Sequence, residues 1–287
     1  MPPAAQKWGS VARHGAQVLG DPGEGSASSA WREAVARART DGGERRTDGG
    51  EARTDEEVWI REEQPDVAPV RPAHALRPRH TVPQPVTEEI AEVAGAQAGA
   101  KLSQRLAEAV HAYDRDRYQE ALRILRPLAR ALPEAAAVRE ILGLTLYRMG
   151  RWPAALKELE EYRALSESSD QLPVMMDCQR ALHNHRAVDA LWEELREASP
   201  SPEVVVEGRI VMAGSLADRG DLPGAIKLLS RDVGVKKPRP HHLREWYALA
   251  DLHERAGDVP RARDLFGRIE AFDPTAFDTR DRLRALR

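Results

Sequence analysis

The side chains best suited to chemistry gather near the middle of the chain. Cys178, His183 and His185 are of the types that bind soft metal ions. Cys178 and His183 are five residues apart, however, which places them on different faces of a helix, and no second pair of ligands follows nearby. We therefore expect Cys178 to be a small core residue and the two histidines to lie at a helix end.

Motifs that would carry catalysis are missing from the sequence. It contains no glycine-rich phosphate loop, no nucleophile elbow and no metalloprotease helix motif. The tripeptide His183-Asn184-His185 resembles part of a nuclease motif, but the sequence around it lacks the hairpin that surrounds this motif in nucleases. Carboxylates such as Glu158, Glu160 and Glu161 are spaced as a solvated helix face rather than as an acid–base pair. These observations predict a protein that is not an enzyme and holds no metal or cofactor.

Composition narrows the class of protein further. The 287 residues include 43 basic and 46 acidic ones, and this net charge of −3 argues against a dedicated nucleic-acid binder. One cysteine excludes an internal disulfide framework. No apolar run is long enough for a membrane span, and the N-terminus lacks a signal-peptide core. We expect a cytoplasmic protein, and the excess of arginine over lysine indicates a high-GC (actinobacterial-type) bacterium.

Residues 1–86 are predicted to form a disordered tail and linker. They contain nine prolines and nine glycines, and the string RTDGGE begins at Arg39 and again at Arg46. Paired glycines disfavour a helix, and this string has no apolar side chain to bury. The prolines between Pro65 and Pro85 favour an extended chain.

Two short apolar islands interrupt this tail. They are either incidental or short docking motifs that become ordered on a partner, and tryptophan is a frequent hot spot of such interfaces. The islands are SAWREAVARAR, residues 29–39, with Trp31, Val35 and Ala38 on one side of a possible helix, and EEVWIREE, residues 56–63, with Val58, Trp59 and Ile60 between acids.

Helical periodicity begins at Thr87, which the sequence predicts to be an N-cap. An alanine-rich lead-in helix is expected over residues 87–101, and a repeat with a period near 34 residues follows over 102–287. The most regular copies begin GRWPAAL at Gly150, GDLPGAI at Gly220 and GDVPRAR at Gly257.

Each column of the repeat has a physical role. Glycine ends one helix in a left-handed conformation, proline opens the next helix, and a small residue lets the two helices approach closely. In the third copy the alignment puts Arg186 in the glycine column and Leu191 in the small-residue column. The small-residue column then contains Ala121, Ala155, Leu191, Ala225 and Ala262.

These residues resemble the tetratricopeptide repeat family, whose unit is a pair of antiparallel helices. The last copy matches with Trp246, Leu249, Ala262, Phe266 and Pro274. The resemblance implies an all-α solenoid of about five helix pairs. It also implies a capping helix over residues 275–287, with Asp278, Arg280, Asp281 and Arg282 facing outward.

The resemblance further implies a non-catalytic scaffold that binds a peptide or partner helix in the groove lined by the first helix of each pair. A competing possibility is that the chain's own segment Val58, Trp59, Ile60 occupies this groove. The alternative class is a regulatory protein that contacts nucleic acid through Arg77, Arg79, Lys236, Lys237 and Arg239, and the loop Lys236–His242 could bind an anion. The expected groove residues are Tyr113, Asp114, Tyr147, Arg148, Arg180, His183, Asn184, Asp218, Tyr247, Asp251, Glu254 and Arg255.

Overall fold

The computed structural model describes residues 83–286, and every regular element within this range is a helix. The helices are α3 (Gln84–Ala94), α4 (Ala96–Asp114), α5 (Tyr118–Ala131), α6 (Ala136–Arg148), α7 (Trp152–Ser166), α8 (Leu172–Ala181), α9 (His185–Ala198), α10 (Pro202–Asp218), α11 (Leu222–Leu229), the short 3-10 helix η1 (Ser230–Asp232), α12 (Pro240–Arg255), α13 (Val259–Phe272) and α14 (Thr279–Ala285).

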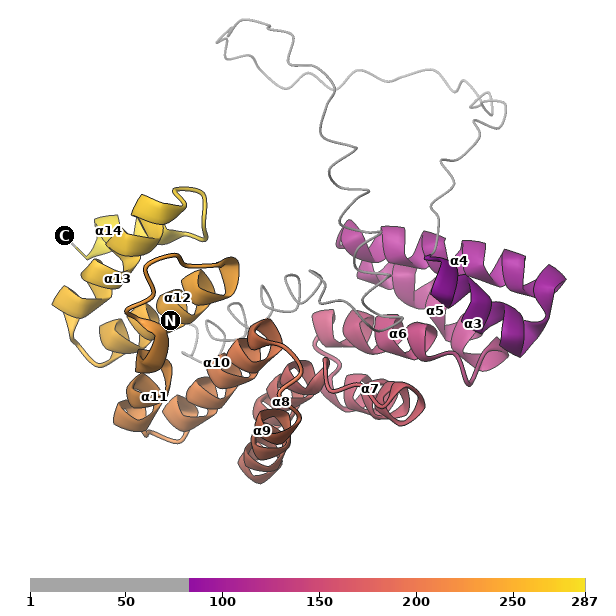
Figure 1. Ribbon diagram of the computed structural model, residues 1–287, viewed down its shortest axis with the longest axis horizontal. Helices are drawn as coiled ribbons and strands as arrows, with labels where there is room; N and C mark the ends of the chain where they lie inside the picture. Colours follow the sequence, from indigo (N-terminus) through magenta and orange to yellow (C-terminus); the bar gives the residue numbers. More distant parts are fainter. Residues whose placement is uncertain (1–82, 287) are drawn as a thin grey trace, which may run out of the picture.

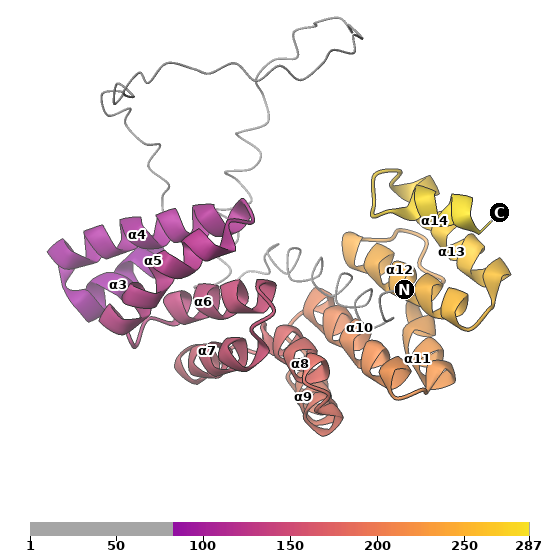
Figure 2. The same ribbon diagram turned by 180° about the vertical axis from the view of Figure 1, so that it is seen from behind.

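The helices pair in chain order and stack into an arc (Figure 1). The pairs are α4–α5, α6–α7, α8–α9, α10–α11 and α12–α13, with α3 before them and α14 after them. The first helices α6, α10 and α12 follow the inner side of the arc, whereas α7 and α11 follow the outer side, and the view from behind in Figure 2 agrees. The predicted solenoid of five helix pairs with a capping helix is confirmed.

One backbone turn joins the two helices of every pair. A residue with positive φ always stands directly before the N-cap residue of the second helix. It is glycine in three pairs, as predicted, and a residue with a side chain in the other two. The five are Asp116 (φ 57°), Gly150 (72°), His183 (58°), Gly220 (87°) and Gly257 (80°).

This turn corrects the alignment of the third copy. His183, and not Arg186, takes the place of the turn glycine. The residue four positions after the N-cap Asn184 is Val188, which is fully buried, whereas Leu191 is half-buried. Ala121, Ala155, Ala225 and Ala262 occupy the same fourth position after their N-caps and are fully buried as well. The close-contact column therefore contains Val188, and the assignment of Leu191 was wrong.

Two glycines provide opposite tests of backbone conformation. At Gly220 the left-handed φ disfavours any Cβ, so we expect Gly220→Ala to lower the free energy of unfolding by about 1–2 kcal/mol. Gly267 lies inside α13, and a Cβ there would meet nothing within 4 Å, so Gly267→Ala should raise the free energy of unfolding by about 0.5–1 kcal/mol. Urea unfolding of both variants measures the difference; the same sign for both changes would contradict this account.

The helices before the first turn differ from the single lead-in helix expected over residues 87–101. α3 begins at Gln84 after Pro83, so Thr87 is not an N-cap; its Oγ1 donates a hydrogen bond of 3.2 Å to the Pro83 carbonyl. Gly95, with φ 79°, divides the predicted lead-in helix into α3 and the start of α4. The predicted tail up to residue 82, with both of its islands, lies outside the described residues.

The core consists of two clusters of buried apolar side chains that meet at α10. One extends from α3 to α10 and includes Val204 and Val211; the other extends from α10 to α13 and includes Val206 and Ile210. α10 thus buries apolar side chains on two sides, as a helix with cores on both faces must.

Candidate functional site

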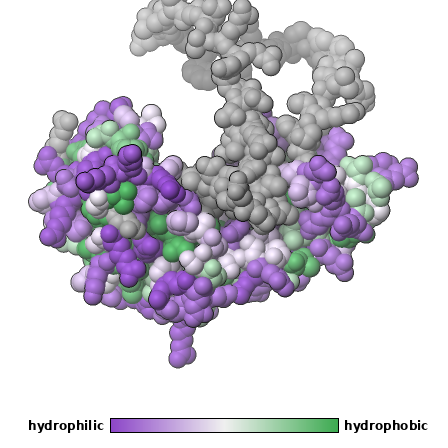
Figure 3. All heavy atoms as spheres, in the orientation of Figure 1, coloured by the Kyte–Doolittle hydropathy of each residue, from purple (hydrophilic) through white to green (hydrophobic). Residues whose placement is uncertain are grey.

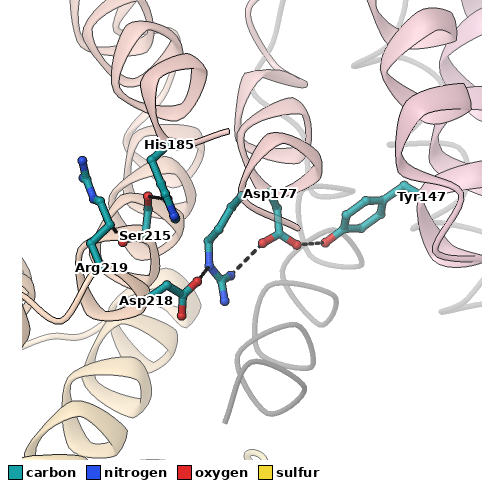
Figure 4. A network of polar contacts seen from close by, with 7 residues as sticks. Tyr147, Asp177, His185, Ser215, Asp218 and Arg219 are labelled. Carbon is teal, nitrogen blue, oxygen red and sulfur yellow. Dashed lines mark hydrogen bonds and ion pairs between the residues drawn. The ribbon is translucent and has the colours of Figure 1, made fainter. Parts of the chain in front are cut away.

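The first helices of neighbouring pairs are joined by a network of buried polar contacts (Figure 4). The Tyr147 hydroxyl on α6 donates to Asp177 Oδ2 on α8 at 2.8 Å. Arg180 binds Asp177 Oδ1 through Nη1 at 2.8 Å and Asp218 Oδ2 on α10 through Nε at 2.7 Å. Arg180 is only 5% exposed, and burial alone would lower the pKa of its guanidinium, but the carboxylates of Asp177 and Asp218 raise this pKa above its usual value. The network therefore ties three consecutive first helices together.

A second set of contacts runs beside this network, between α9 and α10. His185 Nδ1 lies 3.0 Å from the hydroxyl of the buried Ser215, and Arg219 donates to the Ser215 carbonyl at 3.3 Å (Figure 4). Arg219 also binds both carboxylate oxygens of Asp189 at 3.0 Å. A bidentate pair of this kind fixes orientation as well as distance.

The same pattern recurs at the C-terminal end. The Tyr247 hydroxyl on α12 donates to Asp278 Oδ1 at 2.6 Å, and Arg282 on α14 binds Asp251 at 2.6 Å and Glu254 at 2.9 Å. Arg282 therefore faces the preceding repeat, and its predicted outward orientation was wrong. α14 packs against α13, and its Arg282 reaches back to α12. It is shorter than the predicted helix over 275–287.

The polar contacts between α10 and α12 include two ion pairs. Arg244 binds Glu207, and Arg209 binds Glu245 at 2.7 Å; Glu207, Arg244 and Glu245 are almost completely buried. Burial raises the pKa of Glu207 to about 7, although Arg244 opposes the rise. Charge repulsion from Glu245 raises the pKa of Glu207 as well. Folding therefore favours a proton on Glu207 near neutral pH.

The raised pKa predicts how stability varies with pH. Because the pKa of Glu207 is higher in the folded chain than its ordinary 4.5, its protonation stabilises the fold fully below pH 4.5. This contribution is lost as the pH rises through about 7. We expect Glu207→Gln to flatten the decline of unfolding free energy over that range in urea titrations. Glu197→Gln, on an exposed residue, is the control; equal pH profiles for wild type and Glu207→Gln would contradict the assignment.

The structure separates the predicted groove tyrosines into two kinds. Tyr147 and Tyr247 are 1% and 8% exposed and belong to the networks above. Their removal is therefore expected to cost stability, whatever part they have in binding. Tyr113 is half-buried and lies edge-on to Tyr118, with the ring centroids 5.6 Å apart. Burial raises the pKa of Tyr113 to about 12, so its hydroxyl stays protonated.

The remaining predicted residues lie partly outside the first helices. Arg148, at the end of α6, stands over the Tyr118 ring at 5.0 Å and binds Asp116 at 3.2 Å. Arg255 is half-buried at the end of α12. His183 and Asn184 are exposed in the α8–α9 turn, where the Asn184 side chain caps α9 by accepting from Ala187 N. These two residues shape the turn and lie off the face that the other groove residues share.

Other sequence candidates occupy ordinary structural positions. Cys178 is fully buried in α8, and burial raises the pKa of its thiol well above the usual range. Residues 83–286 contain no group of three potential metal ligands. In the loop before α12, Lys236 and Lys237 are exposed, while Arg239 lies 3.7 Å from Glu203. No helix among the described residues is long and apolar enough to cross a bilayer.

The visible surface is mainly hydrophilic, with apolar residues between charged ones (Figure 3). The most exposed large apolar side chain among the described residues is Phe272 at 55%, at the end of α13. Phe277, in the next turn, is 37% exposed and packs on Tyr247 with the ring centroids 4.7 Å apart.

Comparison with known proteins agrees with this repeat geometry. The tetratricopeptide repeat family model matches residues 106–170 and 210–277, so neither stretch includes the divergent pair α8–α9. A thermophilic tetratricopeptide repeat protein of Thermus thermophilus is similar in structure, with a TM-score of 0.52 and 17% identity over 64% of this chain and 98% of that one. The tetratricopeptide repeat domain of P58(IPK) gives a TM-score of 0.31 and 11% identity over 67% of this chain and 66% of that one. Comparison with curated proteins gives no match.

Proposed function

We propose that this protein is a non-catalytic interaction scaffold. The proposal starts from the match of residues 106–170 and 210–277 to the tetratricopeptide repeat family model. The protein's ligand is a peptide or partner helix bound along the first helices, on the inner side of the arc (Figure 1). Tetratricopeptide repeats are in general protein–protein interaction modules. Action in the cytoplasm of a high-GC bacterium belongs to the same proposal.

The observation that carries the proposal is the network Tyr147–Asp177–Arg180–Asp218. Contacts from α6 through α8 to α10 hold these helices in a fixed register, even though α8 belongs to the divergent pair. A ligand that spans several repeats needs a rigid surface, because ordering that surface on binding would cost affinity. The network supplies this rigidity.

Selection from a displayed peptide library against the full chain tests the proposal. A selected peptide should bind at least about 30-fold more weakly to Arg148→Glu or Arg255→Glu, since interface arginines contribute about 2 kcal/mol or more. Matched reversals on second helices, Arg130→Glu on α5 and Glu197→Arg on α9, are both at exposed positions and should change affinity less than about threefold.

Circular dichroism must show that each variant keeps its helical content. Loss of binding in the second-helix variants alone would place the ligand on the outer side of the arc and overturn the proposal. The alternative of nucleic-acid contact predicts instead that Lys236→Glu with Lys237→Glu abolishes retention on heparin; both lysines are exposed.

A further inference from the structure

A row of arginines lies on the exposed side of α5, the second helix of the first pair. Arg123, Arg126 and Arg130 follow one another three and four residues apart, so they share one side of the helix over ~10 Å of its axis. All three are exposed, and none of them forms an ion pair with another residue of the range 83–286. Glu120, the one acid of α5, binds Arg117 at 3.0 Å. The positive charge of this row is therefore uncompensated.

An exposed proline lies within the row. Pro127 follows Arg123 by four residues and precedes Arg130 by three, so it shares their side of α5. Proline has no backbone N–H, and the Arg123 carbonyl therefore does not receive the usual helical hydrogen bond. An indole fits such a surface, because its N–H can donate to a carbonyl and its ring can pack on a proline ring and on guanidinium groups. We call Arg123, Arg126, Pro127 and Arg130 the basic face of α5.

The spacing of the basic face defines the partner that it fits. Counted back from Arg130, Pro127 is three residues away and Arg123 is seven residues away. An antiparallel helix matches this row if it carries an acid, then an aromatic residue three positions later, then a second acid seven positions after the first. An extended peptide does not match, because seven of its residues span ~23 Å.

We propose that the chain's own segment 55–64 binds the basic face of α5 as a short antiparallel helix. Its Glu56, Trp59 and Glu63 have the required spacing of three and seven residues. In this register the two glutamates meet the two outer arginines, and the indole meets the proline between them. The island 56–63 has four glutamates and one arginine, a net charge of −3 (1 − 4), which complements the three arginines.

The sequence around this segment has the signals of a helix start and a helix end. Thr54 and Glu57 have the spacing of a capping box, and early glutamates favour the positive end of the helix dipole. Pro65 follows where the helix must stop. Ten helical residues extend ~15 Å, which is enough to cover the basic face. Isolated helices of this length are marginal in water, so contact with α5 is what would stabilise this one.

The connecting chain is long enough for this contact. Eighteen residues, 65–82, separate the segment from Pro83, and they span ~56 Å as an extended polyproline chain. α3 begins at Gln84 and packs against α4, which packs against α5. Two interhelical spacings of about 10 Å each therefore lie between α3 and α5. Such a short tether also gives the segment a high effective concentration at the basic face.

This inference goes beyond the proposed function. It concerns a second helix, whereas the proposed ligand binds along the first helices. The two proposals can therefore fail separately.

Photo-crosslinking in the full chain tests the inference. With p-benzoylphenylalanine in place of Ile60, we expect crosslinks within one chain to peptides of α5, identified by mass spectrometry. E56R/E63R should lower their yield about tenfold, and so should R123E/R130E, because each replaces attraction with repulsion. The variant that combines all four reversals should recover at least about half of the original yield, since it restores both charge pairs in opposite orientation.

Matched variants separate this contact from a general effect of charge. Lys227→Glu reverses an exposed base on the second helix α11, and E24R/E44R reverses two other acids of the tail. Both should leave the yield within about twofold. Trp59→Ala should lower it about tenfold, because tryptophan is a frequent hot spot of interfaces. Circular dichroism of R123E/R130E must show unchanged helical content.

Four results would overturn the inference: no crosslinks within one chain, crosslinks mainly to the first helices α6, α8 and α10, crosslinks to α5 only between two chains, or a combined variant that stays as low as the two reversals on one side. In each case an Arg148-dependent peptide would still support the scaffold proposal. Loss of that peptide's binding without any change in these crosslinks would remove the scaffold proposal alone.

Discussion

Replacing Arg180 with alanine is expected to lower the free energy of unfolding by about 3–5 kcal/mol, because it leaves Asp177 charged, buried and without its closest cation. Asp177 and Arg180 are each only 5% exposed, so water cannot take over the lost contact. Chemical unfolding of the full chain measures the loss. Introducing Asp177→Asn into the Arg180→Ala variant should recover part of it, since a neutral amide still accepts from Tyr147.

A surface pair provides the matched control for this prediction. Arg196 and Glu193 form a contact of 2.8 Å, but their side chains are 54% and 61% exposed. Arg196→Ala should therefore change the free energy of unfolding by at most about 1 kcal/mol. Equal effects at Arg180 and Arg196 would mean that the buried network does not hold the first helices together.

Tryptophan in the close-contact column is expected to have the second large effect. Ala262→Trp and Val188→Trp each force a large side chain between two touching helices, at a cost of about 3 kcal/mol or more. For a repeat domain of this length that corresponds to a fall in melting temperature of about 6–12 °C. Leu191→Trp, at a half-buried position, should lower it by less than half as much.

The comparison of Val188 with Leu191 decides between two alignments of the third helix pair. Differential scanning calorimetry of the three variants is sufficient. A severe loss for Leu191→Trp together with a mild one for Val188→Trp would restore the sequence-based column and refute the structural one.

The parts of the fold that were predictable from sequence are those that depend on a residue type. Gly150, Gly220 and Gly257 mark turns because their backbone conformation favours glycine, and prolines such as Pro223 mark the first turns of the following helices. In the third pair the same turn is made by His183. Because residues other than glycine seldom adopt positive φ, a histidine in the sequence did not signal the turn, and the column shifted by three residues to Leu191.

The candidate site was predictable only in part, for a different reason. Among the residues expected in the groove, Arg180 binds Asp218, and Asp251 and Glu254 both bind Arg282. The partner of each charge could not be read, because bridging contacts join residues 30 to 38 apart and depend on how far one pair is rotated against the next. Buried ion pairs such as Glu207–Arg244 therefore looked like ordinary charged helix residues.

The double role of α10 has a consequence for the order in which the chain folds during synthesis. Val204 and Val211 complete the N-terminal apolar cluster, so that cluster cannot close until α10 has left the ribosome. Once it has, Val206 and Ile210 already present the surface on which α12 and α13 assemble. The helix that completes the N-terminal cluster thus also provides the surface on which the C-terminal cluster assembles. The two clusters therefore form one after the other and do not compete for partners.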